Sequence, residues 1–147
     1  MKIDLPDVNV LVALFTENHE HHDVAHEWLS TTAGFATTPL TETGFVRVMM
    51  TRTPTNDPLT GTQALDRLRE LRALDNATFW PDGTSLADLR AVTGHLQGPK
   101  QVADTHLLNL AIAAGGRLVT LDKGIAAPLD AKTRRHVHEL ISGCVLM

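Results

Sequence analysis

Four carboxylates of this chain stand where their chemistry could matter. Asp7 and Asp122 each follow a short apolar run, and Glu42 and Asp104 fall in the first turns of two expected helices. A buried carboxylate is costly unless it is paired, hydrogen-bonded or bound to a metal. Acids gathered in one crevice also raise one another's pKa. A cluster of this kind is therefore stable mainly when a cation neutralises it.

The ligand types favour one kind of cation. Carboxylate oxygens are hard ligands, and neither a cysteine nor an evident histidine accompanies the four acids, which favours Mg²⁺ or Mn²⁺ over zinc. Asn9, two residues after Asp7, could donate a hydrogen bond to a ligand carboxylate. Thr120, two residues before Asp122, could do the same or hold a water molecule. Outer partners of this kind orient the ligands of a metal.

Each acid also has an ordinary structural explanation. An aspartate at the end of a strand is often the N-cap of the next helix, and a glutamate in a first helical turn interacts favourably with the helix dipole. For any single acid this alternative is as good as a metal ligand. The set of four, at the expected edge of one sheet, is what favours a metal site.

Short apolar strands alternate with amphipathic helices along the chain. We expect strands at residues 3–6, 35–38, 77–81 and 117–121, with helices at 9–15, 19–32, 40–52, 63–74, 85–92 and 101–114. The segment 135–141 fits either a final edge strand or a helical turn. This alternation implies a parallel sheet covered by helices on both faces, and ligands bind outside the carboxyl ends of such strands. Asp7, Glu42 and Asp122 should project there, and Asp104 joins them if its helix starts there.

The bulk composition is that of one globular domain. The chain has 147 residues, 43% of them hydrophobic, with no repeat or linker, so we expect a single domain over residues 1–147. Cys144 is the only cysteine, which excludes a disulfide within the chain and fits a reducing cytoplasm. No apolar stretch approaches the ~18 residues of a membrane span, and acids and a proline interrupt the N-terminal segment where a signal peptide would be apolar. The net charge of −4 argues against nucleic-acid binding through overall positive charge, but not against a local basic rim.

Other α/β classes fit the pattern less well. A haloacid-dehalogenase-type phosphatase also has an aspartate after its first strand, but it needs a second acid two residues later, where this chain has Asn9. A response-regulator receiver needs paired acids after the first strand; Asp82 could be a mid-chain phosphoacceptor, but the pair is missing. No glycine-rich turn follows the first strand, which disfavours a dinucleotide-binding domain.

Three segments form a recognisable series: DVNVLVALF from Asp7, TTPLTETGFVRVM from Thr37, and VADTHLLNLAIAAGGRLVTLDKG from Val102. Together they resemble the PIN-domain family, and more narrowly the VapC toxins of bacterial toxin–antitoxin pairs. By this resemblance, the family's functional positions fall on Asp7, Asn9, Glu42, Asp104, Thr120 and Asp122.

The resemblance implies a three-layer α/β/α fold with a central parallel sheet of about five strands. It also implies a Mg²⁺- or Mn²⁺-dependent endoribonuclease, the toxin of a toxin–antitoxin system, which forms a homodimer and is inhibited by a VapB-type antitoxin. The chain's own residues support only the sheet, the acidic crevice and the metal. The alternative is an inert PIN-like module that binds RNA or a protein. Such a module would be expected to have lost one or more acids, whereas all four are present here.

The expected chemistry is hydrolysis of a phosphodiester by water. Asp7, Asp104 and Glu42 would hold one ion that activates the water, and Asp122 would lie near a second ion that supports the leaving oxygen. This chemistry needs no 2′-hydroxyl, so the choice of RNA rests on the resemblance.

Several cationic side chains flank the acids in sequence and are candidates for contacts with RNA phosphates. They are Arg47, Arg52, Lys100, Lys123 and, at the rim of the crevice, His106. His22 and His26 have the i, i+4 spacing of metal ligands, but no third ligand is evident, and we expect both to be solvated. An exposed apolar groove among the first helices could receive a helix of the antitoxin.

Overall fold

Five short strands form one parallel sheet at the centre of the computed structural model, which describes residues 2–54, 57–88, 96 and 98–141. The strands are β1 Asp4–Pro6, β2 Phe35–Thr37, β3 Ala77–Phe79, β4 Arg117–Thr120 and β5 Val137–Glu139. Their order across the sheet is β3-β2-β1-β4-β5, and all neighbouring pairs are parallel. The expected sheet of five parallel strands is confirmed, and segment 135–141 contains the edge strand rather than a helical turn.

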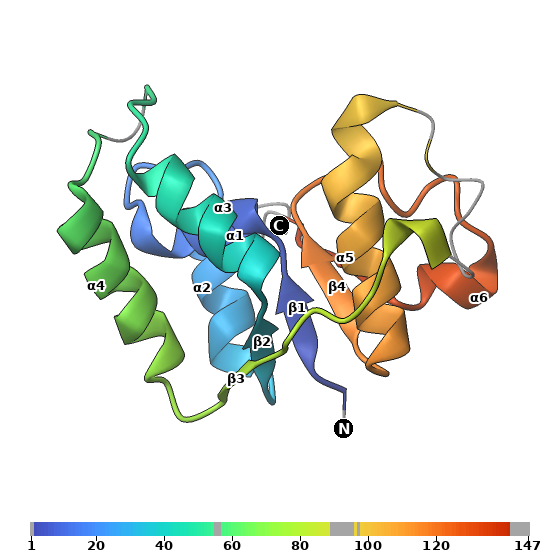
Figure 1. The fold of residues 1–147 in the computed structure, drawn as a ribbon. Helices are drawn as coiled ribbons and strands as arrows, with labels where there is room; N and C mark the ends of the chain where they lie inside the picture. The colour runs from blue at the N-terminus through green and yellow to red at the C-terminus, as the bar shows by residue number, and fades with distance from the viewer. Residues whose placement is uncertain (1, 55–56, 89–95, 97, 142–147) are drawn as a thin grey trace.

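Helices cover both faces of this sheet (Figure 1). On one side lie α1 Val8–Phe15, α2 His22–Thr31, α3 Pro39–Met49 and α4 Gly61–Arg72. On the other side lie α5 Val102–Ala113 and the short α6 Ala131–Arg134, together with the 3-10 turns η1 Leu86–Asp88 and η3 Pro99–Gln101. The expected three-layer α/β/α architecture is confirmed.

Each face of the sheet carries its own hydrophobic core. Phe35 and Val119 point into the core shared with α1 to α4, whereas the adjacent Ala36 and Leu118 point into the core shared with α5. Successive residues of a strand alternate between the two faces. A strand buried on both faces favours apolar residues at successive positions, which explains the short apolar runs in the sequence.

The ends of the helices follow local sequence signals. Thr38 and Thr41 form a capping box at the start of α3, and Pro39 occupies its first turn, where the missing amide hydrogen costs nothing. Thr60 caps α4 in the same way, with Gln63 as its partner. Gly115 ends α5 with a φ of 75°, a left-handed conformation that side chains with a Cβ disfavour.

One expectation about the helices needs adjustment. The helix expected at 85–92 is a single 3-10 turn, Leu86–Asp88, as far as the structure describes it, and residues 89–95 lie outside the described part. The leucine stripe of α4 is only partly core, because Leu71 is buried but Leu65 is 41% exposed. No helix among the described residues is both long and apolar enough to cross a membrane.

Candidate active site

Asp7 lies between the last residue of β1 and the first residue of α1. It is the N-cap of α1, and its Oδ1 accepts a hydrogen bond from the Val10 amide at 3.0 Å. Its Oδ2 accepts one at 2.6 Å from the hydroxyl of Thr120, 113 positions later in the sequence. The pairing of β1 with β4 brings these two residues together, because Pro6 is in register with Val119.

The surroundings of Asp7 disfavour its charge. Its side chain is nearly inaccessible, with 5% of the residue exposed. Burial raises the pKa of Asp7; the hydrogen bonds from Thr120 and Val10 oppose this rise, and the charge of Asp122 adds to it. Within the described residues, no lysine, arginine or histidine forms an ion pair with Asp7. A buried carboxylate held only by neutral donors keeps a large part of its desolvation cost.

Asp104 and Asp122 bring two further negative charges to this edge of the sheet. Asp104 lies in the first turn of α5, and Asp122 follows β4. Burial, together with the charges of Asp7 and Asp122, raises the pKa of Asp104 to about 6. The Asp122 amide donates to the Thr120 hydroxyl at 3.0 Å, so Thr120 contacts two of the acids. We call Asp7, Asp104 and Asp122 the aspartate trio.

Glu42, the fourth predicted acid, is held separately from the trio. It lies in the first turn of α3, where its Oε2 accepts a hydrogen bond from the Thr37 hydroxyl at 2.7 Å. The same oxygen lies 3.6 Å from Nε of Arg72, in the last turn of α4. The charge of Glu42 is not among those that raise the pKa of Asp7 or Asp104. Asp7, Asp104 and Asp122 therefore act electrostatically on one another, whereas the fourth predicted acid lies beside a cation.

A cleft of about 300 Å³ opens beside the trio. Asp7 and Asp104 line it, together with residues of α1, α3 and α5. Gly44 allows these two helices to approach closely, because a Cβ at this position would lie 2.6 Å from Cγ2 of Val8. Glu42 instead lines a groove of about 650 Å³ between α3 and α4, and Arg47 borders both hollows.

The donor chemistry of the trio suits a hard divalent cation. The trio offers carboxylate oxygens that form no ion pair with a lysine, arginine or histidine among the described residues. In the described part of the chain, no three His, Cys, Asp or Glu side chains converge into a ready-made ligand set. Zinc relies on three or four protein ligands, whereas Mg²⁺ keeps several waters and uses one or two carboxylates. The residues present therefore fit Mg²⁺ or Mn²⁺ better than zinc.

Comparison with known proteins agrees with this geometry. Residues 5–128 match the family model of the PIN domain. The chain belongs to the PIN-domain family. Ribonuclease VapC39 of Mycobacterium tuberculosis is 41% identical to it over 134 residues, which cover 86% of this chain and 94% of that protein. Ribonuclease VapC38 of the same species is 42% identical over 125 residues, which cover 82% of this chain and 86% of that protein.

A solved structure supports the fold of this PIN domain independently of sequence. The crystal structure of Mycobacterium tuberculosis VapC20, described as a sarcin–ricin loop cleaving toxin, superposes with a TM-score of 0.62. The superposition covers 85% of this chain and 94% of that one, at 14% sequence identity. At this identity the likeness shows the shared fold alone.

The two outer partners expected in the PIN domain differ in their contacts. Thr120 is fully buried and bonds two members of the trio, as its position predicted. Asn9 is exposed and lines the cleft, and its side-chain amide makes no hydrogen bond to any residue that the structure describes. The expected hydrogen bond from Asn9 to a ligand carboxylate is therefore not formed here.

The cationic candidates for RNA contacts lie at different distances from the acidic edge. Arg47 is exposed on the border of the cleft, and the exposed Lys123 directly follows the last member of the trio. Arg52 forms an exposed ion pair with Asp57 at 2.9 Å and does not line the cleft. The side chain of Lys100 lies outside the described part of the chain. Arg47 and Lys123 remain the best placed for phosphates.

His106 is engaged by a partner that sequence reasoning missed. Its Nε2 lies 2.5 Å from Oδ2 of Asp82, and 13% of its side chain is exposed. Oδ1 of Asp82 accepts hydrogen bonds from the amide and the hydroxyl of Thr84 at 3.0 and 2.9 Å. Burial raises the pKa of Asp82, but the bonds from His106 and Thr84 outweigh it and lower the pKa. The pair ties the loop after β3 to α5; the Asp-Gly-Thr turn was the only sequence signal for it.

His26 is exposed as expected, whereas His22 is half-buried, and each imidazole contacts a backbone carbonyl of α1. The His22 Nδ1 lies 2.7 Å from the carbonyl oxygen of Ala13, and the His26 Nε2 lies 2.9 Å from that of Leu14. These carbonyls belong to the last turn of α1, where helical acceptors lack partners within the helix. The two histidines therefore fasten the end of α1 to α2, which favours a structural role.

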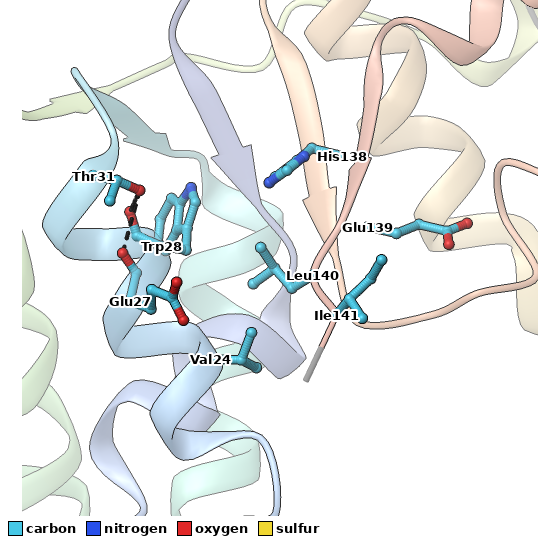
Figure 2. Close-up of a pocket in the computed structure, with 8 residues that line it drawn as sticks. All are labelled: Val24, Glu27, Trp28, Thr31, His138, Glu139, Leu140 and Ile141. Carbon is cyan, nitrogen blue, oxygen red and sulfur yellow. Dashed lines mark hydrogen bonds between the residues drawn. The ribbon is translucent and has the colours of Figure 1, made fainter. Parts of the chain in front are cut away.

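A further hollow, of about 260 Å³, lies between α2 and the chain around β5 (Figure 2). Trp28, Val24 and Leu140 form its apolar wall, with Glu27 and Glu139 at its sides. None of the four predicted acids lines it. This hollow is separate from the candidate active site.

Proposed function

We propose that this chain is a Mg²⁺- or Mn²⁺-dependent endoribonuclease and the toxin of a toxin–antitoxin pair. The observation that carries the proposal is the aspartate trio beside the cleft: among the described residues, none of its three carboxylates forms an ion pair with a lysine, arginine or histidine. The relatives supply the substrate class, since VapC39 and VapC38 are named ribonucleases. The alternative, an inert binding module, does not explain why three acids are kept together at an energetic cost.

Asp7, Asp104 and Asp122 are the residues that would hold the ion. When bound, the ion would activate a water and stabilise negative charge on the phosphoryl oxygens. Thr120 keeps the Asp7 carboxylate in one orientation through its 2.6 Å hydrogen bond. Arg47 and Lys123, exposed beside the acidic edge, would hold phosphates of the RNA backbone.

The proposed partners follow from the same family relationship. A VapB-type antitoxin would inhibit the enzyme, and a homodimer is the expected assembly. The groove between α3 and α4 suits an amphipathic helix of the antitoxin, because Val46, Met50, Leu65 and Leu68 give it an apolar lining. We place the protein in the cytoplasm, where its proposed substrate and partner occur.

Cleavage of total cellular RNA tests the proposal. We expect the purified chain, free of antitoxin, to cut RNA with Mg²⁺ or Mn²⁺ and to stop when EDTA removes the ion. Asp104→Asn should lower the rate by more than about 100-fold, since losing only an outer partner of a metal costs about 10–100-fold. Asp75→Asn is the matched control, because Asp75 is exposed and lines none of the hollows described above.

The outcome separates the two functions. A folded wild-type chain that binds RNA but cuts nothing with either ion would favour the inert module. Cleavage that persists in EDTA, or that Asp104→Asn leaves unchanged, would contradict the role given to the trio.

A further inference from the structure

A hollow of about 470 Å³ lies beside the edge strand β5. Its lining combines strand residues, residues of the chain between β4 and β5, and two cations: Val137, Glu139, Ala126, Ala127, Lys123 and Arg134. In the sheet, β5 lies next to β4, and Lys123 directly follows Asp122 in the sequence. The hollow therefore adjoins the aspartate trio on the side of β5, whereas the cleft of about 300 Å³ adjoins it on the side of α1 and α3.

Backbone carbonyls hold the guanidinium of Arg134 in one place. Its Nε donates to the carbonyl oxygen of Ala126 at 3.2 Å, and its Nη2 donates to those of Ala127 and Leu129 at 3.3 and 2.6 Å. Leu129 is itself buried against the α5 side of the sheet, so the loop that Arg134 grips is anchored. The third nitrogen, Nη1, has no hydrogen-bond partner among the residues that the structure describes. Because carbonyls are neutral, these bonds fix the guanidinium without cancelling its charge and leave one of its ends free to donate.

Neither cation of the hollow is neutralised by a nearby acid. In the described ranges, neither Lys123 nor Arg134 forms an ion pair, although Glu139 also lines the hollow. The pKa of the exposed Asp130 is lowered chiefly by its hydrogen bonds from Thr133, and the charge of Arg134 contributes less. Two unpaired cations, one of them fixed in place, form a site for an anion, and a guanidinium is well suited to a phosphate.

We propose that Arg134 and Lys123 bind backbone phosphates of the RNA on the β5 side of the aspartate trio. The inference rests on the proposed function, because it assigns the hollow to the same substrate. Arg47 borders the cleft on the other side of the trio, so an RNA strand that crosses the acids would meet a cation before and after them. Contacts of this kind fix the position of the strand and carry no sequence information.

Binding of RNA without metal tests this subsite separately from cleavage. The probe is a fluorescein-labelled oligouridylate in EDTA, and its anisotropy gives the dissociation constant at several salt concentrations. Each phosphate contact to a single strand contributes about 0.7 to the slope of log K against log salt. We expect Arg134→Gln and Lys123→Gln each to reduce the slope by about 0.7, which is about a 5-fold loss of affinity at about 0.1 M salt.

The two variants and one control separate charge from structure. Arg134→Gln also removes hydrogen bonds of the loop, whereas the Lys123 side chain makes no hydrogen bond or ion pair with any described residue, so Lys123→Gln changes the charge alone. Arg69→Gln removes the same charge as Arg134→Gln, but Arg69 lies on α4, pairs with Asp66 at 3.1 Å and does not line the hollow. The control should bind the oligouridylate with the affinity and slope of the wild type.

The outcomes distinguish this inference from the proposed function. Wild-type binding in both variants, or an equal loss in Arg69→Gln, would overturn the inference and leave metal-dependent cleavage standing. A lower melting temperature in Arg134→Gln, with wild-type binding in Lys123→Gln, would make Arg134 a clamp of the loop only. Loss of inhibition by the antitoxin, with RNA binding unchanged, would assign the hollow to the antitoxin instead. A wild-type chain that binds no oligouridylate would overturn the inference alone if it cuts total RNA, and both proposals if it does not.

Discussion

Two buried aspartates at opposite ends of β1 have opposite surroundings. Asp4 is 2% exposed and Asp7 is 5% exposed. Asp4 accepts hydrogen bonds from Arg117 at 2.7 Å, Trp28 at 2.8 Å and Thr32 at 2.9 Å. Asp7 accepts hydrogen bonds only from neutral donors. The charge of Asp122 raises the pKa of Asp7, and the charge of Asp7 raises the pKa of Asp104.

The pKa values of the two residues move in opposite directions. Burial raises the pKa of Asp4, but the bonds from Arg117, Trp28 and Thr32 outweigh it, so the pKa lies below its ordinary value. Burial raises the pKa of Asp7, and its hydrogen bonds do not offset this. The charge of Asp4 is thus compensated within the protein, whereas that of Asp7 is not.

The difference separates a structural acid from a functional one. At the start of β1, the fold supplies an arginine and uses the carboxylate to join β1, β4 and α2. At the carboxyl end of the same strand, the fold gathers acids that form no ion pair with a cationic side chain in the described part of the chain, which is costly unless a cation arrives from solution. We therefore expect Asp4 to stabilise the fold and Asp7 to bind the metal.

The largest effect on stability is expected at Asp4. Asp4→Asn removes the charge that faces Arg117, and a lost hydrogen bond to a charged group costs about 1.5–3 kcal/mol. We expect the free energy of unfolding to fall by about 2–3 kcal/mol and the melting temperature by about 4–12 °C. Urea unfolding and calorimetry measure these changes. A loss below about 0.5 kcal/mol would show that the arginine pair contributes nothing.

The pH dependence of stability should have opposite signs at the two ends of the sheet. The pKa of Asp4 is lower in the folded state than in the unfolded state. Asp4 therefore adds to the free energy of unfolding in full above the unfolded pKa of about 3.9, and this addition disappears as the pH falls through the folded pKa. Because the folded pKa of Asp104 is about 6, its charge lowers the free energy of unfolding above pH 6, and this destabilisation disappears toward pH 4.

Metal-free protein in EDTA reveals both signs. The wild type should have a higher free energy of unfolding than Asp4→Asn, and this difference should disappear below about pH 4. Relative to Asp104→Asn, the wild type should gain stability between pH 7 and pH 4. Parallel pH curves for the wild type and Asp104→Asn would mean that the trio does not repel in the folded state.

The smallest effect on stability is expected at Asp7. Asp7→Asn removes a charge without a counter-charge and keeps an oxygen that can cap α1. We expect metal-free stability to be unchanged or raised by up to about 1 kcal/mol, while RNA cleavage is lost. Thermal unfolding in EDTA measures the first expectation and an RNA assay the second. A large destabilisation would identify Asp7 as a structural cap.

The sheet and the trio could be predicted because both follow from local patterns. The apolar runs gave the strands, alternation with helices made the sheet parallel, and the carboxyl ends of β1 and β4 placed Asp7 beside Asp122 and Thr120. The capping residues were equally local signals. Position relative to a strand end was enough to place Asp7 and Asp122 at one edge of the sheet, whereas Asp104 reaches that edge from the first turn of α5.

The contacts that join distant helices could not be predicted from the chain alone. Asp4 and Asp7 look alike in the sequence, and partners distant in the chain distinguish them, above all Arg117, 113 residues after Asp4. The pairing of Arg72 with Glu42 depends on how α4 packs against α3, which no spacing encodes. For the same reason His106 was interpreted as a rim residue and His22 as solvated.

The most direct test of the account is the effect of Mn²⁺ on the melting temperature of the wild type, Asp4→Asn and Asp7→Asn. A ligand at 100 times its dissociation constant stabilises the folded state by about 2.7 kcal/mol, which is about 5–11 °C for a chain of this size. We predict a shift of this order in the wild type and in Asp4→Asn, and little or none in Asp7→Asn. No shift in the wild type, or an equal shift in Asp7→Asn, would contradict the claim that the carboxyl edge of the sheet is built for a cation.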